Sequence, residues 1–297
     1  MIRSIAKRGR KFLGKKYRSL IQVLSLIFFN IWGRGYFAGN IYKGKSKMIC
    51  VPVLNCYSCP GAWGACPIGS LQAVIGSAKY KISYYVSAMI MLFGLIFGRF
   101  ICGFLCPFGF LQDILYKIKS KKVKINKKLD KKMRYIKYII AIVFVILLPT
   151  FFVNRFNMAS PYFCKYICPA GTLGGGIPLI FMNSNLQKVV GGLFTWKLFI
   201  LILIIVLSVF ISRPFCKYIC PLGAFYGLFN KFSLYQLDID KKKCTDCLMC
   251  EKSCPMDINP VNEINSAECI KCGQCASKCP QNCISINKKQ NKKYSKN

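Results

Sequence analysis

Long apolar runs dominate the hydrophobic pattern of this chain. Three of them, at residues 84–101, 135–153 and 194–211, can form helices that cross a hydrocarbon core of about 30 Å, which takes roughly 20 residues. A fourth run, at residues 20–37, is interrupted by polar residues and glycines, and Arg34 near its end can reach the headgroups. The pattern predicts an α-helical polytopic membrane protein with about four transmembrane helices.

A short motif, C-P-x-G, recurs along this frame. Its four copies begin at Cys66, Cys106, Cys168 and Cys220, and three of them have a second cysteine four residues earlier, at Cys102, Cys164 and Cys216. The order span, motif, span, motif therefore occurs twice, at residues 20–118 and 135–232. Two such units in the same orientation predict tandem repeats related by an axis along the membrane normal.

The repeat predicts two groups of membrane cysteines that are candidate metal or redox sites. Cysteines at positions i and i+4 lie on one side of a helix, so two pairs can present four thiolates to one centre. The inner group, at the cytoplasmic ends of the spans, comprises Cys102, Cys106, Cys216 and Cys220. The outer group comprises Cys50, Cys56, Cys59, Cys66, Cys164 and Cys168. Arg99 and Arg213, each three residues before an inner cysteine, can offset the negative charge of the inner centre.

Other interpretations of the membrane cysteines stay open. They can be buried residues that pack as small apolar side chains. Four of them, Cys50, Cys56, Cys59 and Cys66, lie in one outer loop rich in Gly and Pro. That loop can hold an iron–sulfur centre by itself, or its cysteines can form disulfides on an oxidising face.

Two cysteine runs near the C-terminus carry the clearest chemistry. Each reads C-x2-C-x2-C-x3-C-P, the spacing of two-cluster bacterial ferredoxins, in which the fourth cysteine of each run binds the other cluster. The spacing predicts one [4Fe–4S] cluster on Cys244, Cys247, Cys250 and Cys279, and a second on Cys269, Cys272, Cys275 and Cys254. A zinc site or a disulfide framework is the alternative for a single C-x2-C, but the doubled run with both prolines disfavours it. We interpret Cys283, outside the pattern, as core packing.

Charge and composition limit which partners and cofactors the chain can bind. Basic residues outnumber acidic ones by 44 to 9, a balance that would suit nucleic acid, but they gather in blocks flanking the apolar runs. We therefore expect no nucleic-acid partner and a multi-pass protein of the cytoplasmic membrane with both termini in the cytoplasm. No cleavage site follows the basic N-terminus, so an uncleaved anchor is expected. The chain contains no histidine, which excludes His-ligated haem.

These features together predict the organisation of the chain. It comprises a basic cytoplasmic N-terminus (1–19), a first membrane repeat (20–118), a basic cytoplasmic loop (119–134), a second membrane repeat (135–232), an α+β ferredoxin domain with two [4Fe–4S] clusters (238–287) and a basic tail (288–297). The basic tail is expected to contact anionic lipid.

The motifs resemble those of the membrane-bound ferredoxin-type 4Fe-4S proteins with C-x3-C-P signatures. This family includes the quinol-oxidising ferredoxin subunit of periplasmic nitrate reduction and the C-terminal half of the nitrous-oxide-reductase regulator. The stretches LNCYSCPG at residues 54–61 and CPIGSLQ at 66–72 resemble a branch described only as 4Fe-4S binding proteins. The resemblance implies electron transfer between quinone-pool or cytoplasmic donors and redox partner proteins at or beyond the membrane.

We therefore expect an electron-transfer component of an oxidoreductase system rather than a stand-alone enzyme. A metal-handling reductase, for example of copper, and a redox sensor or assembly factor are the alternatives. Asp113 is the acid nearest to a membrane segment, and is either a quinone-site acid or an exposed or paired carboxylate. The membrane cysteines would add a further iron–sulfur or metal centre to the two clusters.

Overall fold

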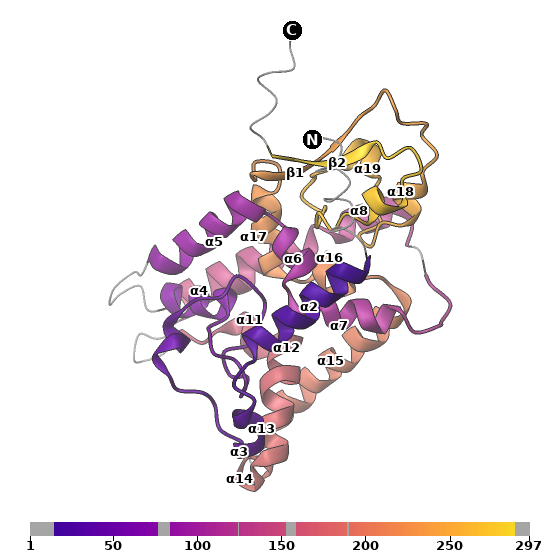
Figure 1. Cartoon of the computed structure of the whole chain (residues 1–297). Coiled ribbons are helices and arrows are strands. Elements are labelled where there is room, and N and C mark those ends of the chain that lie inside the picture. Colours follow the sequence, from indigo (N-terminus) through magenta and orange to yellow (C-terminus); the bar gives the residue numbers. More distant parts are fainter. Residues whose placement is uncertain (1–14, 77–83, 124, 153–158, 189, 289–297) are drawn as a thin grey trace.

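The computed structural model describes residues 15–76, 84–123, 125–152, 159–188 and 190–288. It is mostly helical, with a two-stranded sheet near the C-terminal end of the chain (Figure 1). The predicted basic N-terminus lies almost wholly outside the described residues, as does the tail beyond Lys288.

The elements follow one another in three stretches. The first contains α2 (Lys15–Phe29), α3 (Arg34–Ala38), the 3₁₀ turn η1 (Lys45–Met48), α4 (Pro67–Gly76), α5 (Tyr84–Phe97), α6 (Phe100–Phe104), α7 (Pro107–Tyr116) and α8 (Lys127–Met133). The second contains α9 (Ile136–Ile140), the π-helical η2 (Ala141–Leu147), α10 (Leu148–Phe151), α11 (Tyr162–Tyr166), α12 (Pro169–Gly171), the π-helical η3 (Thr172–Gly176), α13 (Ile177–Met182) and α14 (Ser184–Gln187). The third contains α15 (Gly192–Phe210), α16 (Pro214–Tyr218), α17 (Pro221–Phe229), β1 (Tyr235–Ile239), α18 (Met249–Lys252), α19 (Pro260–Glu263), α20 (Gln274–Lys278) and β2 (Ile284–Lys288).

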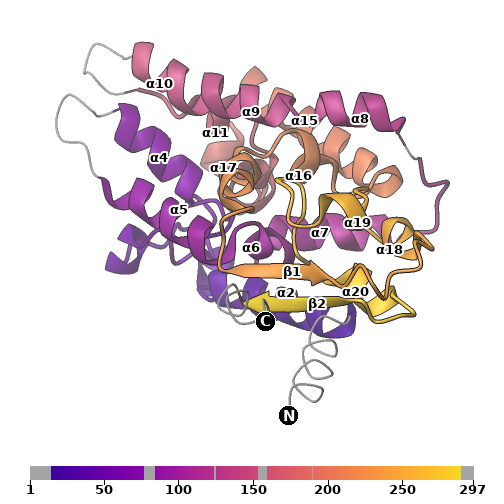
Figure 2. The same cartoon turned by 90° about the horizontal axis from the view of Figure 1, so that it is seen from above.

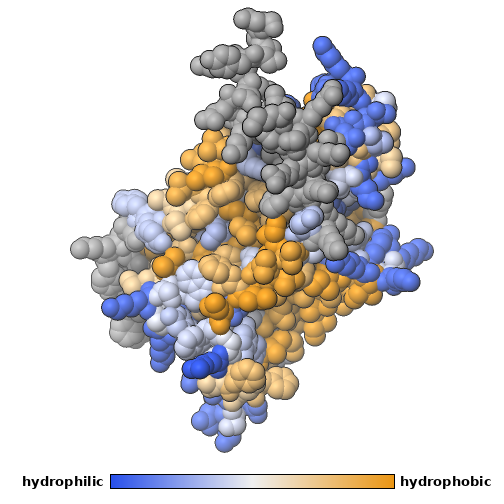
Figure 3. All heavy atoms as spheres, in the orientation of Figure 1, coloured by the Kyte–Doolittle hydropathy of each residue, from blue (hydrophilic) through white to orange (hydrophobic). Residues whose placement is uncertain are grey.

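Within the described residues, two helices are long and apolar enough to cross a membrane. One is α15, of 19 residues, and the other is the continuous helical stretch Lys127–Phe151, of 25 residues, that joins α8, α9, η2 and α10. Side chains such as Trp196, Phe199 and Ile202 of α15 are more than half exposed, as suits a lipid-facing surface. Figure 3 shows this apolar surface across the middle of the molecule, with hydrophilic surface at its upper right and lower ends. The length and composition of these two helices favour a membrane protein.

The other two predicted spans are shorter than expected. Helix α2 has 15 residues and α5 has 14, which at 1.5 Å per residue gives about 21–23 Å, less than the hydrocarbon core. Helix α5 ends because Gly98 adopts a left-handed conformation (φ +56°), and a Cβ atom there would lie 2.5 Å from Oδ1 of Asn230. Four spans and two tandem repeats are therefore not confirmed and stay a prediction.

The C-terminal cysteine runs lie in a small α+β unit. Strands β1 and β2 pair antiparallel, with Leu237 opposite Ile286, and helices α18 and α20 pack against each other. Figure 2 shows the two strands side by side, next to α20 and over α6. This unit stands on the helical part at one end of the molecule, so its second cysteine run faces the membrane helices (Figure 1).

Candidate metal centres

The structure brings the C-terminal cysteines together in the crosswise sets that the spacing predicts. Cys244, Cys247, Cys250 and Cys279 line one cavity of about 20 Å³, here called the cluster 1 site. Cys254, Cys269, Cys272 and Cys275 line another of about 20 Å³, the cluster 2 site. Cysteine thiolates at this spacing are the ligands that [4Fe–4S] clusters take, so both donor sets fit the cofactor.

The two sites share a backbone shape. The residues on either side of the second cysteine are left-handed in both runs: Asp246 and Leu248 in the first, Lys271 and Gly273 in the second. Three residues after the fourth cysteine, Asp257 and Asn282 are left-handed as well. Such turns wrap the chain closely around the cavity, and only Gly273 adopts them without strain.

Exposure differs between the sites. Cys247 is exposed at the cluster 1 site, and its neighbours Leu248 and Met249 are exposed apolar side chains. At the cluster 2 site, three of the four cysteines are buried, and Cys254 is half-buried. The cluster 1 site is therefore the more accessible of the two from the surface.

Cys283 has a position that the sequence did not reveal. It is buried, as expected for core packing, but it also lines the cluster 1 cavity, with its Sγ 3.3 Å from Sγ of Cys279. The signal was its spacing of four residues after Cys279, which placed it on the same side of the chain.

The inner cysteines also meet. Cys102 and Cys106, around α6, and Cys216 and Cys220, around α16, line one enclosed cavity of about 10 Å³, here called the inner site. All four side chains are buried. The size of this cavity is comparable to that of the two ferredoxin cavities, and its four thiols are the same donor set.

The C-P-x-G motif has a local explanation. Cys106 and Cys220 are N-cap residues of α7 and α17, and the following proline occupies the first helical turn, where it has no N–H to lose. The amide of Gly223, three residues after Cys220, donates a hydrogen bond of 3.4 Å to Sγ of Cys220. The motif thus directs a sulfur atom at a helix N-terminus, where negative charge is stabilised.

The two predicted arginines contact the inner site reciprocally. Arg99 donates to the carbonyl of Cys216 (3.1 Å), and Arg213 donates to the carbonyl of Cys102 (2.9 Å). Both arginines are fully buried, so their positive charges act on the cavity with little screening. This is the arrangement that a negatively charged centre requires.

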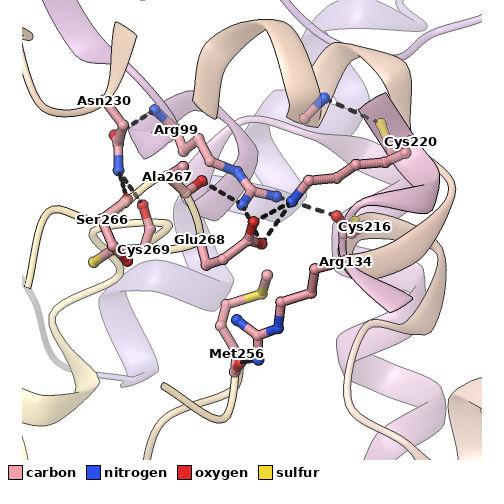
Figure 4. A network of polar contacts seen from close by, with 12 residues as sticks. Arg99, Arg134, Cys216, Cys220, Asn230, Met256, Ser266, Ala267, Glu268 and Cys269 are labelled. Carbon is pink, nitrogen blue, oxygen red and sulfur yellow. Dashed lines mark hydrogen bonds and ion pairs between the residues drawn. The ribbon is translucent and has the colours of Figure 1, made fainter. Parts of the chain in front are cut away.

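Acidic side chains pair with these buried cations. Arg99 donates to Oε2 of Glu268 (3.0 Å) and to the carbonyl of Ala267 (2.8 Å), and Nζ of Lys137 lies 2.5 Å from Oε1 of Glu268 (Figure 4). Glu268 directly precedes Cys269 of the cluster 2 site. The network therefore ties the ferredoxin unit to the helices that carry the inner site.

Asp113 is a paired carboxylate. It accepts hydrogen bonds from Arg213 (2.7 Å to Oδ1) and Gln22 (3.3 Å) and is ion-paired with Arg18. Burial alone would raise its pKa, but the charges and hydrogen bonds of both arginines outweigh burial and lower the pKa to about 2. A carboxylate held ionised in this way is a poor proton acceptor for a quinol, so the paired alternative fits better.

The structure divides the outer cysteines. Cys56, Cys66, Cys164 and Cys168 line one cavity of about 320 Å³, here called the outer site. Cys50 is buried beside Ala65, with which it forms a backbone bridge, and Cys59 lies 2.9 Å from the hydroxyl of Tyr36. The four loop cysteines at positions 50, 56, 59 and 66 are thus not brought to one point.

Two glutamines contact cysteine sulfurs and were given no role by the sequence. Gln112 donates to Sγ of Cys216 (3.2 Å), and Gln72 donates to Sγ of Cys164 (3.4 Å). Each lies six residues after a C-P-x-G cysteine, and this common spacing was the signal that could have revealed them.

No three Cys, Asp or Glu side chains within the described residues converge as they would around a single metal ion. At all four sites the thiols instead surround a cavity.

Comparison with known proteins identifies the family. A 4Fe-4S binding domain matches residues 83–126, 137–180 and 193–239, and a 4Fe-4S dicluster domain matches residues 236–280. The first of these covers three of the C-P-x-G motifs, and the second covers the paired cysteine runs.

Characterised and uncharacterised proteins share these features. The uncharacterised protein MJ0750 of Methanocaldococcus jannaschii is 32% identical over 54% of this chain and 59% of its own length. The putative electron transport protein YccM of Escherichia coli is 25% identical over 69% of this chain and 56% of its own. The methylamine utilization ferredoxin-type protein MauN of Paracoccus denitrificans is 35% identical over 29% of this chain and 32% of its own.

The chain spans little more than half the length of MJ0750 and YccM. No solved structure matches it. The match of both 4Fe-4S models and the likeness to ferredoxin-type relatives confirm the resemblance in the motifs. The chain belongs to the ferredoxin-type proteins with 4Fe-4S binding domains.

Proposed function

We propose that the chain is a membrane-anchored iron–sulfur relay between cytoplasmic or quinone-pool donors and a redox partner protein at or across the membrane. Cys244, Cys247, Cys250 and Cys279 would hold one [4Fe–4S] cluster, and Cys254, Cys269, Cys272 and Cys275 a second. Cys102, Cys106, Cys216 and Cys220 would hold a further centre. Each centre, when bound, supplies a one-electron redox site.

One contact carries the proposal. Helix α6 packs so closely on the cluster 2 loop that a Cβ atom at Gly103 would lie 2.6 Å from the carbonyl oxygen of Ile270 and 3.8 Å from Cβ of Cys272. Gly103 directly follows Cys102 of the inner site, and it packs against the loop that carries Cys272 of the cluster 2 site. The contact therefore joins the two sites. This closeness supports electron transfer between them, because tunnelling rates fall steeply with distance.

The exposed edge of the cluster 1 site supports entry of electrons from a soluble donor. Cys247, Leu248 and Met249 are all exposed there, and the apolar pair would exclude water when a partner docks. In the proposed path, an electron enters at the cluster 1 site, passes to the cluster 2 site and then reaches the inner site, nearer to the bilayer.

The contacts of the basic loop support the predicted topology. Nζ of Lys127 in α8 lies 2.5 Å from Oε1 of Glu251 in α18, and Arg134 donates to the carbonyl of Met256 (2.7 Å). The Lys-rich start of the Lys127–Phe151 helix and the ferredoxin unit therefore share one side. By the positive-inside rule that side is the cytoplasm. A multi-pass arrangement with both termini there is part of the proposal.

A lipid-side pocket supports exchange with a quinone. A cavity of about 280 Å³ lies between α2 and α7 and has apolar walls that include Leu26, Leu111 and Ile114. Its polar end carries Tyr36, whose hydroxyl lies 2.9 Å from Sγ of Cys59. Its wall residue Leu54 also lines the inner and outer cavities, so a bound molecule would lie beside both. Apolar walls with few polar groups are typical of small-molecule sites.

Anaerobic purification with iron and sulfide counting and EPR tests the relay. Two cubanes require about eight iron atoms per chain, and any further centre appears as iron beyond that number. Replacing Cys102 and Cys216 together by Ser should remove the iron of the inner centre and leave the ferredoxin signals in place. Cys50→Ser is the control, since Cys50 is not among the cysteines that line these cavities.

Different results would overturn the relay as a whole and the inner centre alone. Material without iron, or with zinc in its place, would overturn the relay as a whole. An iron content that the double variant leaves unchanged would overturn the inner centre alone.

A further inference from the structure

The outer site is built on the same plan as the inner site. At the inner site, Oε1 of Gln112 accepts from the amide of Phe215 (3.2 Å) while its Nε2 donates to Sγ of Cys216. At the outer site, Oε1 of Gln72 accepts from the amide of Phe163 (2.9 Å) while its Nε2 donates to Sγ of Cys164. Both glutamines are about 1% exposed. Each Nε2 also donates to a carbonyl one helical turn earlier, that of Phe108 for Gln112 (3.4 Å) and that of Ile68 for Gln72 (3.2 Å), so both amides are held in the same way.

The helices around the two sites correspond as well. At the inner site, α7 and α17 each begin with the proline of a C-P-x-G motif. At the outer site, α4 and α12 begin in the same way, at Pro67 and Pro169. Four helix N-termini thus direct Cys66, Cys106, Cys168 and Cys220 into two cavities, one pair to each.

One cysteine differs between the sites. The first cysteine of the inner pair is Cys102, four residues before Cys106, whereas the residue four before Cys66 is Ala62. Cys56 supplies the missing thiol from the preceding loop: its Sγ lies 3.6 Å from a Cβ atom built at Gly171, in the C-P-x-G motif of Cys168. The sequence motif does not reveal this role of Cys56, because Cys56 lies ten residues before Cys66, whereas Cys102 lies four residues before Cys106.

Basic side chains lie beside the outer site, as they do beside the inner site. Nζ of Lys197, from α15, lies 3.7 Å from the same Cβ position at Gly171, so it borders the cavity beside Cys56. Lys165 lines the cavity too. A cluster with four thiolate ligands carries net negative charge, which these cations offset as Arg99 and Arg213 do at the inner site.

From this correspondence we infer that Cys56, Cys66, Cys164 and Cys168 hold a further iron–sulfur cluster, with Cys50 and Cys59 excluded from it. The inference rests on the proposed relay and adds its outer end. Cys56 and Cys164 are half-buried, unlike the four buried inner cysteines, and the outer cavity is wider, at about 320 Å³. The outer site is therefore the end at which an electron reaches a partner on that face.

Two variants from one loop test the inference. Cys56→Ser should lower the iron content by about four atoms per chain relative to the parent if the centre is a cubane. Cys59→Ser, three residues away, should keep the full iron content. Both are purified anaerobically and compared by iron and sulfide counting and by EPR during reductive titration.

The outcomes separate this inference from the relay. Retention of the ferredoxin EPR signals in both variants shows that each has folded. Equal iron contents in Cys56→Ser, Cys59→Ser and the parent would overturn the outer cluster while leaving the relay intact. A Cys56–Cys59 or Cys164–Cys168 disulfide in parent protein purified anaerobically would also overturn it. Loss of all iron signals from the parent would instead overturn the relay itself.

Discussion

Gly103 and Ile270 approach so closely that no side chain fits between them. A Cβ atom on Gly103 would lie 2.6 Å from the carbonyl oxygen of Ile270, a backbone atom that cannot rotate away. Gly103→Ala should therefore push the ferredoxin unit from α6 and lower the free energy of unfolding by about 1–3 kcal/mol. Electron transfer from the cluster 2 site to the inner site, followed by stopped-flow absorbance, should slow.

Gly33→Ala is the matched control, because a Cβ atom there meets nothing within 4 Å and its φ is negative. If Gly103→Ala transferred electrons and unfolded as Gly33→Ala does, the contact would have no part in the relay.

Gln112 should set the potential of the inner site. Its amide donates 3.2 Å to Sγ of Cys216, and hydrogen bonds to cluster sulfurs stabilise the more negative, reduced state. Gln112→Leu should therefore lower the midpoint potential of the inner centre in an EPR-monitored titration, without loss of iron. Gln72→Leu should lower that of the outer centre in the same way.

Gln236→Leu in β1 serves as reference because the side-chain amide of Gln236 donates to the carbonyl of Lys231 (2.7 Å) and not to a cysteine sulfur. An unchanged midpoint potential of the inner centre in Gln112→Leu would contradict this role. Equal shifts of that potential in Gln112→Leu and Gln236→Leu would contradict it as well.

Glu268 holds two buried cations together. Arg99 and Lys137 are 0% exposed, and both contact the carboxylate of Glu268. Glu268→Gln should destabilise the protein by about 3–5 kcal/mol, since it leaves two buried charges without their partner. Thermal unfolding in detergent, read from the iron–sulfur absorbance, measures the change.

The surface pair of Asp240 and Lys243 (2.9 Å) provides the comparison. Asp240→Asn should leave the unfolding temperature unchanged, because water screens an exposed pair. Similar effects of the two substitutions would show that the Glu268 network contributes no more than a surface pair.

Tyr36 should be needed for quinol but not for a soluble donor. Its hydroxyl is at the polar end of the pocket between α2 and α7, next to Cys59. Tyr36→Phe should raise the KM for a short-chain quinol about tenfold, the effect of losing roughly 1.4 kcal/mol of hydrogen bonding. Tyr57→Phe, at an exposed hydroxyl, should leave it unchanged.

Reduction of the same variants by dithionite controls for the clusters themselves. An unaltered KM for quinol in Tyr36→Phe would remove this pocket from the proposed function.

Local spacing explains what could be predicted from the residues alone. The C-x2-C-x2-C-x3-C-P runs and the C-P-x-G copies encode tight loops and helix starts within a few residues, so their geometry follows from sequence. Cys254 faces the cavity of Cys269, Cys272 and Cys275, as the crosswise pattern predicts. The 19 residues of α15 and the 25 of Lys127–Phe151 likewise follow from unbroken apolar runs.

Contacts between distant segments decided the rest. The helix before Arg99 ends at Gly98 because the chain there packs against Asn230, more than 130 residues away. Gly98 and Arg99 lie inside the predicted run at residues 84–101, but the prediction extended the span past them and so overstated its length. In the same way, Cys56 and Cys59 are three residues apart in one loop and both border the pocket between α2 and α7, yet only Cys56 also lines the outer site.

The sequence by itself determined that this chain carries 4Fe-4S binding motifs, because cysteine spacing defines the loops that surround such clusters. Only the tertiary structure decided which outer thiols share a cavity, which sulfur atoms the glutamines contact and where the ferredoxin unit meets the helices. Those choices depend on packing between residues about 100 positions apart, such as Gln112 and Cys216. Local spacing does not specify which of these distant residues meet.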